Sequence, residues 1–306
     1  MDATTLDQLR IGLDPLSQAG LALALFIIMF SVALGLKTDD FSAAMKNPAA
    51  YFGGVFGQIV GLPLLTMGLL LILSPPPSIA LGMIVVASCP GGNVSNMMAY
   101  FGRGDVALSV ALTATSSLIA AFLMPVMILF WSGLYPPTAN LLDHIQFDPA
   151  AFIIQTTALL AIPLIVGMSL ARWAAPLAAR LQKPGATTGT ILLAVIVVYG
   201  TLDLLPQLFG ALPIIMPPVI LHSACAFLLG ATIARLLRRD VPVRRSLTLE
   251  IGLQNSGLAM VILIGQFDGL GGAAAVAAAW GVWHLIVGGA IIGIYRNMDQ
   301  KNQSTP

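Results

Sequence analysis

The chain alternates between long runs of apolar residues and short polar connections rich in proline and glycine. An apolar run of about 20 residues is long enough to cross the roughly 30 Å hydrocarbon layer of a membrane as a helix. Runs of this length predict nine transmembrane helices. They lie at residues 16–36, 49–73, 78–100, 106–131, 150–171, 188–209, 212–236, 247–267 and 272–295. Because the connections are short, we expect one transmembrane domain over residues 1–306, folded as a compact all-α bundle.

Composition supports a membrane protein. The 306 residues are 58% hydrophobic and 9% charged, with a mean hydropathy of +0.92, whereas soluble domains carry about 25% charged residues. A net charge of +1 gives no field that would attract nucleic acid. Cys89 and Cys225 both lie in apolar stretches, so neither a disulfide framework nor a metal cluster is expected. The first 15 residues hold three aspartates and one arginine, which is unlike a cleavable signal peptide, so we expect a mature start.

The basic residues predict the orientation, since they concentrate in cytoplasmic connections. An odd number of spans places the two termini on opposite sides of the membrane. With the N-terminus outside, the only basic residue outside is Arg10, and all the others lie inside. The inside residues are Lys37, Lys46, Arg103, Arg172, Arg180, Lys183, Arg235, Arg238, Arg239, Arg244, Arg245, Arg296 and Lys301. We therefore expect a multi-pass inner-membrane protein with its C-terminus in the cytoplasm.

Residues 89–96 interrupt the third predicted helix with helix breakers and small polar residues. Pro90 lacks an amide donor, and Gly91 and Gly92 lower the cost of irregular backbone torsions, so we expect the helix to unwind there. Unwound backbone inside a membrane is tolerated where it is buried in protein or lines a cavity. The alternative is a simple proline kink.

Residues 248–258 interrupt the eighth predicted helix in a similar way, in the second half of the chain. The two interrupted helices run in opposite directions in the predicted topology, and one further helix follows each of them. This arrangement is typical of an inverted-topology repeat, in which discontinuous helices meet near the midplane and form the site for substrate and coupling ion.

Glu250 is the only glutamate in the chain, and it lies in the second interruption. A charge at the centre of a bilayer costs about 2.5 kcal/mol or more, so it should face the interior and have a partner. No lysine or arginine is predicted at a similar depth, which favours a bound cation or a proton. The alternative is that Glu250, five residues after Arg245, reaches the headgroups, but this leaves Gln254, Asn255 and Ser256 unexplained.

Other polar residues in the predicted helices indicate a functional site less specifically. Ser109 and Thr113 are four residues apart and share a helix face; their hydroxyls suit sodium, although such pairs are more often helix-packing devices. Gln58 requires some polar partner. His222 and His284 are interpreted as structural, because neither has a second ligand at metal-binding spacing.

Two motifs make the chain similar to the bile acid:sodium symporter family over about residues 24–295. They are Cys89-Pro90-Gly91-Gly92-Asn93-Val94-Ser95-Asn96, followed by Arg103-Gly104-Asp105-Val106-Ala107-Leu108-Ser109-Val110, and Leu249-Glu250-Ile251-Gly252-Leu253-Gln254-Asn255-Ser256-Gly257. The resemblance implies a core domain with two crossed, broken helices beside a panel domain, in a nine-span form that lacks the first of ten helices. The panel would contain 16–36, 150–171 and 188–209, and the core 49–73, 78–100, 106–131, 212–236, 247–267 and 272–295.

The resemblance also implies site residues. One sodium site would use Ser95, Asn96, Ser109, Thr113 and Glu250. A second would use Gln58, Gln254, the Glu250 side chain and the main-chain carbonyls of Ile251 and Leu253. Substrate would contact Asn93, Asn255 and His284. The chain departs from its relatives at Asn93, where threonine is common, and at Leu285, where a polar residue can follow the histidine.

We therefore expect a sodium-coupled symporter that takes up an organic anion by alternating access. The anion would be bile-acid-like, steroid-like or a small keto or hydroxy acid. Partners would be sodium, the anion and the bilayer, with no nucleic acid and no cofactor, and a monomer is expected. Coupling to protons is the alternative, and a non-transporting membrane sensor is a second one. An enzyme is not expected, because Ser95 and Ser256 have no histidine partner within their motifs.

Overall fold

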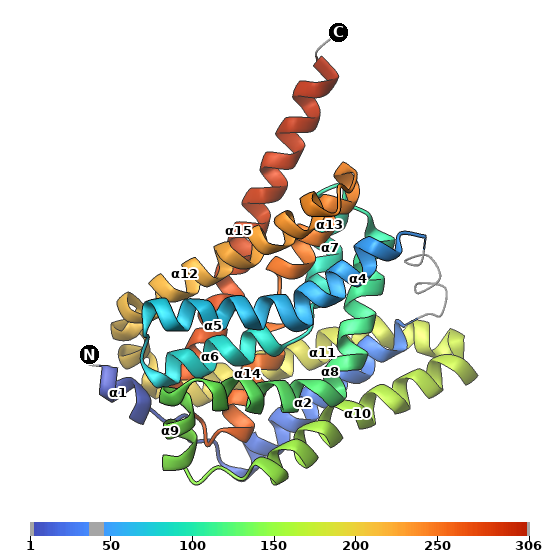
Figure 1. Ribbon diagram of the computed structural model, residues 1–306. Helices are drawn as coiled ribbons and strands as arrows, with labels where there is room; N and C mark the ends of the chain where they lie inside the picture. Colours follow the sequence, from blue (N-terminus) through green and yellow to red (C-terminus); the bar gives the residue numbers. More distant parts are fainter. Residues whose placement is uncertain (1–2, 37–45, 305–306) are drawn as a thin grey trace.

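The computed structural model describes residues 3–36 and 46–304, and in these residues the protein is all-helical (Figure 1). Lys37, which was used above for the orientation, lies outside the described residues. The helices are α1 (Ala3–Gln8), α2 (Pro15–Leu34), α4 (Pro48–Phe56), the π-helical turn η1 (Gly57–Gly61), α5 (Leu62–Leu73), α6 (Pro77–Ser88), α7 (Asn93–Phe101), α8 (Val106–Leu134), α9 (Pro136–His144), α10 (Pro149–Trp173), α11 (Ala175–Thr201), the 3₁₀ turn η2 (Leu202–Leu204), α12 (Leu205–Leu236), α13 (Val241–Gly252), α14 (Ser256–Gln266) and α15 (Gly271–Ser304).

Aspartates in the polar connections cap the helices that follow them. Asp14, Asp105 and Asp148 precede α2, α8 and α10, and each side chain accepts hydrogen bonds from backbone amides of the first turn. Proline occupies the first turn of α2 and α10, where its missing amide hydrogen is not needed. These caps give each apolar run a defined beginning.

Six helical stretches in the described residues are long and apolar enough to cross a membrane. Two shorter apolar helices, α6 and α14, belong to the interrupted segments. The structure thus supports a polytopic membrane protein, while the count of nine spans and the inverted repeat stay predictions. Large apolar side chains on the outer helices, such as Ile154, Ile162 and Ile191, are exposed, as expected where a helix faces lipid.

Several predicted boundaries differ from the structure. Helix α11 begins at Ala175, well before residue 188, and α13 begins at Val241, before residue 247. The run 188–209 was expected to be one helix, but α11 ends at Thr201 and α12 begins at Leu205 after the turn η2. Pro206 stands in the first turn of α12, so a new helix starts inside the apolar run, where hydropathy gives no boundary. The last helix was expected to end at residue 295, but α15 continues to Ser304.

Both predicted interruptions are confirmed. Helix α6 ends at Ser88 and α7 begins at Asn93, while α13 ends at Gly252 and α14 begins at Ser256. The two unwound segments, residues 89–92 and 253–255, lie against each other. The amide of Asn255 donates to the carbonyl of Pro90 at 2.9 Å, and Gly91 and Gln254 pair as an antiparallel bridge. We call these residues the crossing segments.

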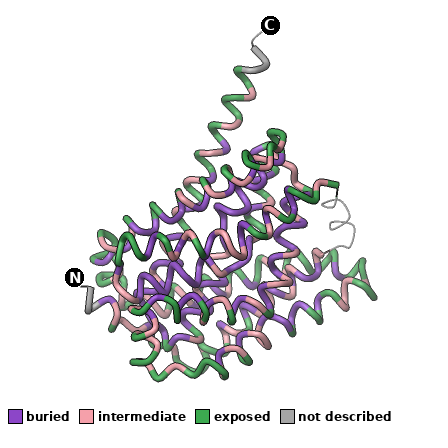
Figure 2. Tube along the Cα trace, viewed as in Figure 1, coloured by how far each residue is buried: buried purple, intermediate pink, exposed green. Residues whose placement is uncertain are grey.

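Helices α2, α10 and α11 pack on one another and touch the rest of the bundle through α8 and α14. The remaining long helices pack around the crossing segments, and buried residues run through the middle of the bundle (Figure 2). Helix α13 lies especially close to α12, because a methyl group on Gly230 would overlap the carbonyl oxygen of Leu247 and lie 2.9 Å from the Cα of Thr248. This close backbone contact positions α13, which carries Glu250.

Candidate functional site

Glu250 lies in the last turn of α13, just before the crossing segment, and is 0% exposed. Its carboxylate accepts hydrogen bonds from two hydroxyl groups of α8: Ser109 Oγ lies 2.7 Å from Oε2, and Thr113 Oγ1 lies 2.5 Å from Oε1. The ion pairs found among the described residues involve arginines at other places, and none includes Glu250. The alternative in which Glu250 reaches the headgroups does not fit this burial.

The same two hydroxyls also contact the side chain of Asn96 on α7. Asn96 Oδ1 lies 2.9 Å from Ser109 Oγ and 3.1 Å from Thr113 Oγ1. Each hydroxyl has one hydrogen but faces two acceptors, so the two hydrogens cannot serve all four of these oxygen–oxygen contacts at once. Ser95 Oγ, which donates to the carbonyl of Gly92, lies 3.4 Å from Thr113 Oγ1.

The five residues predicted for the first sodium site are therefore together in space. We call the side-chain oxygens of Ser95, Asn96, Ser109, Thr113 and Glu250 the oxygen cluster. They come from three elements, α7, α8 and α13, that meet only because two helices are broken. The cluster has more acceptor oxygens than hydrogens, which is a set of ligands that suits a hard cation.

Two glutamines predicted for the second site contact the backbone of α13 next to Glu250. Gln58 Nε2 donates to the carbonyl of Glu250 at 3.1 Å, and Gln254 Nε2 donates to the carbonyl of Ile251 at 2.9 Å. Both glutamines are 3% exposed, and the amide oxygen of each has no hydrogen-bond partner among the described residues. Leu253, which was expected to offer its carbonyl, is buried in the crossing segment. Because these buried oxygens have no hydrogen-bond partner among the described residues, their lone pairs are available to coordinate a cation.

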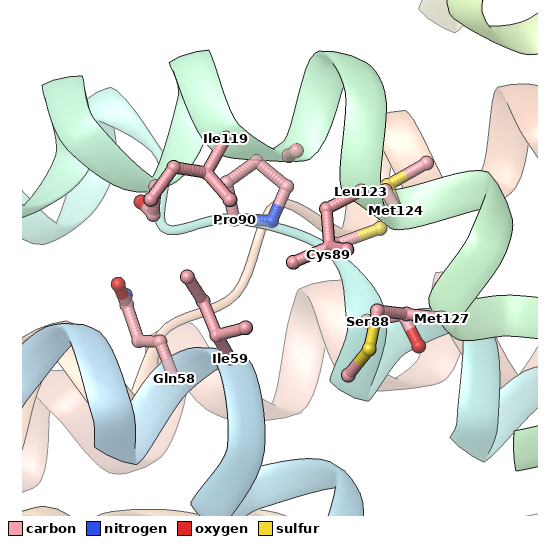
Figure 3. A pocket seen from close by; sticks show the side chains of 11 residues that line it. Gln58, Ile59, Ser88, Cys89, Pro90, Ile119, Leu123, Met124 and Met127 are labelled. Carbon is pink, nitrogen blue, oxygen red and sulfur yellow. The ribbon is translucent and has the colours of Figure 1, made fainter. Parts of the chain in front are cut away.

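Gln58 lies on the π-helical turn η1, between α4 and α5. Such turns are rare and are frequent at functional sites. A small cavity of about 20 Å³, enough for about one water molecule, lies beside it and is lined also by Cys89, Pro90, Ser116 and Met124. Figure 3 shows Gln58 on one side of this space and the Cys89-Pro90 segment on the other.

Gly91 is needed for space rather than for torsion. The prediction that Gly91 and Gly92 ease irregular torsions is not what the backbone shows, because Gly269 is the glycine with a positive φ among the described residues. A methyl group on Gly91 would instead overlap Glu250 Oε1 and lie 2.9 Å from Gln58 Nε2. On Gly92 the nearest atoms would lie at 3.9 Å, an ordinary contact.

The three residues predicted to contact substrate line one cavity of about 250 Å³ between the crossing segments and helices α2, α11 and α15. Asn93 is exposed to it, and Asn255 caps α14 by accepting from the amide of Leu258 at 3.0 Å. His284 on α15 is 4% exposed, and its Nδ1 has no partner among the described residues. Ser95 and Gln254 line the same cavity, which therefore borders the oxygen cluster.

A second cavity, of about 320 Å³, was not predicted. It touches the oxygen cluster at Asn96 and Thr113, shares Asn93 with the first cavity, and is lined also by Gly35, Val110 and Gln182. Gln182 lies in α11, but it precedes the run expected to be a span, 188–209, so sequence reasoning placed it in a polar connection and missed it. His222, by contrast, is the structural residue that was expected, since its Nε2 lies 2.7 Å from Thr66 Oγ1 and its ring packs on Trp280.

Comparison with known proteins connects this arrangement to transport. The profile of the Sodium Bile acid symporter family matches residues 22–208. The chain is 31% identical over 281 residues to the Uncharacterized sodium-dependent transporter YocS of Bacillus subtilis, covering 91% of this chain and 83% of that protein. It is 30% identical over 280 residues to the Probable sodium/metabolite cotransporter BASS1, chloroplastic, of Arabidopsis thaliana (90% and 67% covered). It is 27% identical over 281 residues to the Ileal sodium/bile acid cotransporter of Mus musculus (90% and 78% covered).

Proposed function

Because the chain belongs to the sodium bile acid symporter family, whose members are sodium-coupled transporters and not enzymes, we propose that it is a symporter that takes up an organic anion together with sodium across the inner membrane. The observation that carries this proposal is the fully buried carboxylate of Glu250, surrounded by hydroxyl and amide oxygens and without an ion-pair partner among the described residues.

Sodium is the coupling ion in this proposal. The first ion binds in the oxygen cluster, where it supplies the positive charge that Glu250 lacks and contacts the oxygens that share too few hydrogens. A second ion binds near Gln58 and Gln254, whose unpartnered amide oxygens support the site. Its other ligands are the Glu250 carboxylate and the carbonyls of Ile251 and Leu253. Oxygen ligands without sulfur or imidazole favour sodium over a transition metal.

The architecture in the proposal is the nine-span inverted repeat, with the N-terminus outside and the C-terminus in the cytoplasm. The panel corresponds to α2, α10 and α11, and the packing of α2 against both of the other helices supports this grouping. The other long helices and the broken pairs α6–α7 and α13–α14 form the core. A monomer contains both complete sites.

The organic anion binds in the 250 Å³ cavity between the panel and the crossing segments. Helices α7 and α14 both begin at this cavity, and their N-terminal amides favour a carboxylate. Asn93, Asn255 and His284 add polar contacts. Sodium orders the crossing segments first, so its binding favours the conformation that holds the anion, by a few kcal/mol of differential affinity. The core then moves against the panel and exposes both to the cytoplasm.

The test compares two ion gradients. Purified protein is first screened with taurocholate, pyruvate and lactate for a thermal shift that needs NaCl and does not occur in KCl. The anion with the largest shift is then used for uptake into proteoliposomes. We expect an inward sodium gradient to drive accumulation and a pH gradient of equal driving force to drive none. Uptake with the pH gradient alone would support proton coupling through Glu250, and binding without flux under either gradient would support a sensor.

Gln254 gives a more local prediction for the second ion site. Gln254→Ala removes an unpartnered buried amide oxygen, so we expect the sodium concentration for half-maximal uptake to rise about tenfold, equivalent to about 1.4 kcal/mol. Uptake is measured against NaCl at constant ionic strength. Gln155→Ala, on the exposed face of α10, is the matched control and should behave as wild type. An unchanged sodium dependence in Gln254→Ala would remove this residue from the site.

A further inference from the structure

The broken helices need anchors at their outer ends. Helices α7 and α13 are only 9 and 12 residues long; α7 begins at one crossing segment and α13 ends at the other, so neither is held in place by a continuous membrane-spanning helix. Together with α8 they carry every residue of the oxygen cluster. Whatever fixes the far ends of α7 and α13 therefore also fixes the distances between the cluster oxygens.

At this end of the bundle, Arg245 is a buried charge that the proposed ion sites do not use. It lies on α13, five residues before Glu250, and its side chain is 7% exposed. Its guanidinium lies 4.8 Å above the ring of Tyr295 and donates to the carbonyl of Gly102, immediately after α7. A buried arginine requires a counter-charge.

Asp299 supplies that charge from the part of α15 beyond the expected span. Its Oδ1 lies 2.5 Å from Arg245 Nη2 and its Oδ2 lies 3.0 Å from Arg245 Nη1, a two-pronged ion pair. The same Oδ2 lies 3.2 Å from Nη1 of Arg103, which follows α7. One carboxylate thus joins α13 to the end of α7, and α15 extends past the neighbouring helices here (Figure 1).

Two further bonds fix the same end. Arg296 Nε on α15 donates to the carbonyl of Phe101 at 3.1 Å, so arginines from two elements contact the C-terminal carbonyls of α7, where positive charge is favoured. Ser246 Oγ on α13 donates to the carbonyl of Asp105, the cap residue of α8, at 2.8 Å. These bonds tie α13 to the end of α7 and to the start of α8, and these three helices carry the oxygen cluster.

We propose that Asp299 is a positioning residue for sodium binding: through Arg245 and Arg103 it holds α13 and α7 at the spacing at which Glu250 meets Ser95 and Asn96. The inference rests on the proposed function, since it concerns the affinity of the same ion site. Without the carboxylate, two guanidinium groups repel each other across the α7–α13 contact, and the oxygens of the cluster separate.

The test measures sodium binding without any substrate. The melting temperature of purified protein is followed against NaCl, with KCl keeping the ionic strength constant. We expect Asp299→Asn to raise the half-saturating sodium concentration about tenfold, and Asp299→Glu to restore most of the affinity. Asp268→Asn, in the exposed pair with Arg10, is the control for loss of an ion pair.

A purely structural role predicts something else. In that case Asp299→Asn would melt at a lower temperature in KCl but keep the wild-type half-saturating sodium concentration, and the inference would be wrong. If Asp299→Asn is not recovered from the membrane, Arg103→Gln tests the same link, at a side chain that is 58% exposed. We expect this variant to raise the half-saturating sodium concentration two- to threefold. An unchanged half-saturating concentration would overturn the inference. A wild-type protein that does not distinguish NaCl from KCl would refute the proposed function itself.

Discussion

Glu250→Gln is expected to abolish sodium-dependent uptake, with at least about a 100-fold loss, equivalent to about 2.7 kcal/mol or more. Glutamine keeps the shape of the side chain and one acceptor oxygen, but it removes the one charge of the oxygen cluster and of the proposed second ion site. Cation affinity depends strongly on the number of charged ligands. The measurement is uptake into proteoliposomes under a sodium gradient, normalised to the amount of protein in the membrane.

The same variant should not be unstable. Removing a buried carboxylate that has no ion-pair partner in the described part of the chain relieves a desolvation cost, so in KCl we expect Glu250→Gln to melt at or above the temperature of the wild-type protein. In NaCl the wild-type protein should gain stability and the variant should not. Asp268→Asn, at an exposed carboxylate, should keep the full sodium response. Sodium-dependent uptake at the wild-type level by Glu250→Gln would refute the assignment of both ion sites.

Gly91→Ala is expected to reduce sodium-dependent uptake by about ten- to 100-fold. The added methyl group would overlap Glu250 Oε1 and crowd Gln58 Nε2, and each belongs to a proposed ion site. Overpacking of a tight site typically costs 1–3 kcal/mol, and here the groups that must move are the ion ligands. Uptake and the sodium-dependent thermal shift should therefore fall together.

Gly92→Ala is the matched control for Gly91. It adds the same methyl group one residue later, where the nearest atoms lie at 3.9 Å and belong to Asn255. Gly92 has an extended backbone that any residue adopts, so uptake should stay within about twofold of wild type. Equal losses in both variants would mean that the crossing segment needs glycine for its backbone and not for the space beside Glu250.

The sequence predicted the presence of the helices better than the residues at which they begin and end. Hydropathy located the long apolar helices, and the run 89–96 indicated a break because a proline next to two glycines, followed by small polar residues, disfavours a continuous helix. Hydropathy could not reveal that α12 begins at Leu205, because it does not change within an apolar run where one helix ends and the next begins. It also ended α15 too early, since the polar residues after Tyr295 continue the helix and are tied to α7 and α13 by Asp299.

The candidate site shows the same division. The position of Glu250 among helix breakers was enough to predict a buried charge that needs a cation or a proton, and the family motifs suggested the residues around it. Sequence spacing could not bring Asn96, Ser109 and Glu250 together, because they come from three helices. Nor could it distinguish Gly91 from Gly92, which look identical in the motif and differ in what lies beside them.

By itself, the sequence determined that this is a membrane protein with two interrupted helices and one glutamate at an interruption. These properties are local, because the hydrophobicity of a run and the torsional limits of proline act within a few residues. Only the tertiary structure decided that the interruptions cross, that the hydroxyls of α8 face Glu250, and that Asp299 joins Arg103 to Arg245. Those contacts link residues up to 196 positions apart, and they depend on how close-packed helices bring oxygen atoms and charges to hydrogen-bonding distance.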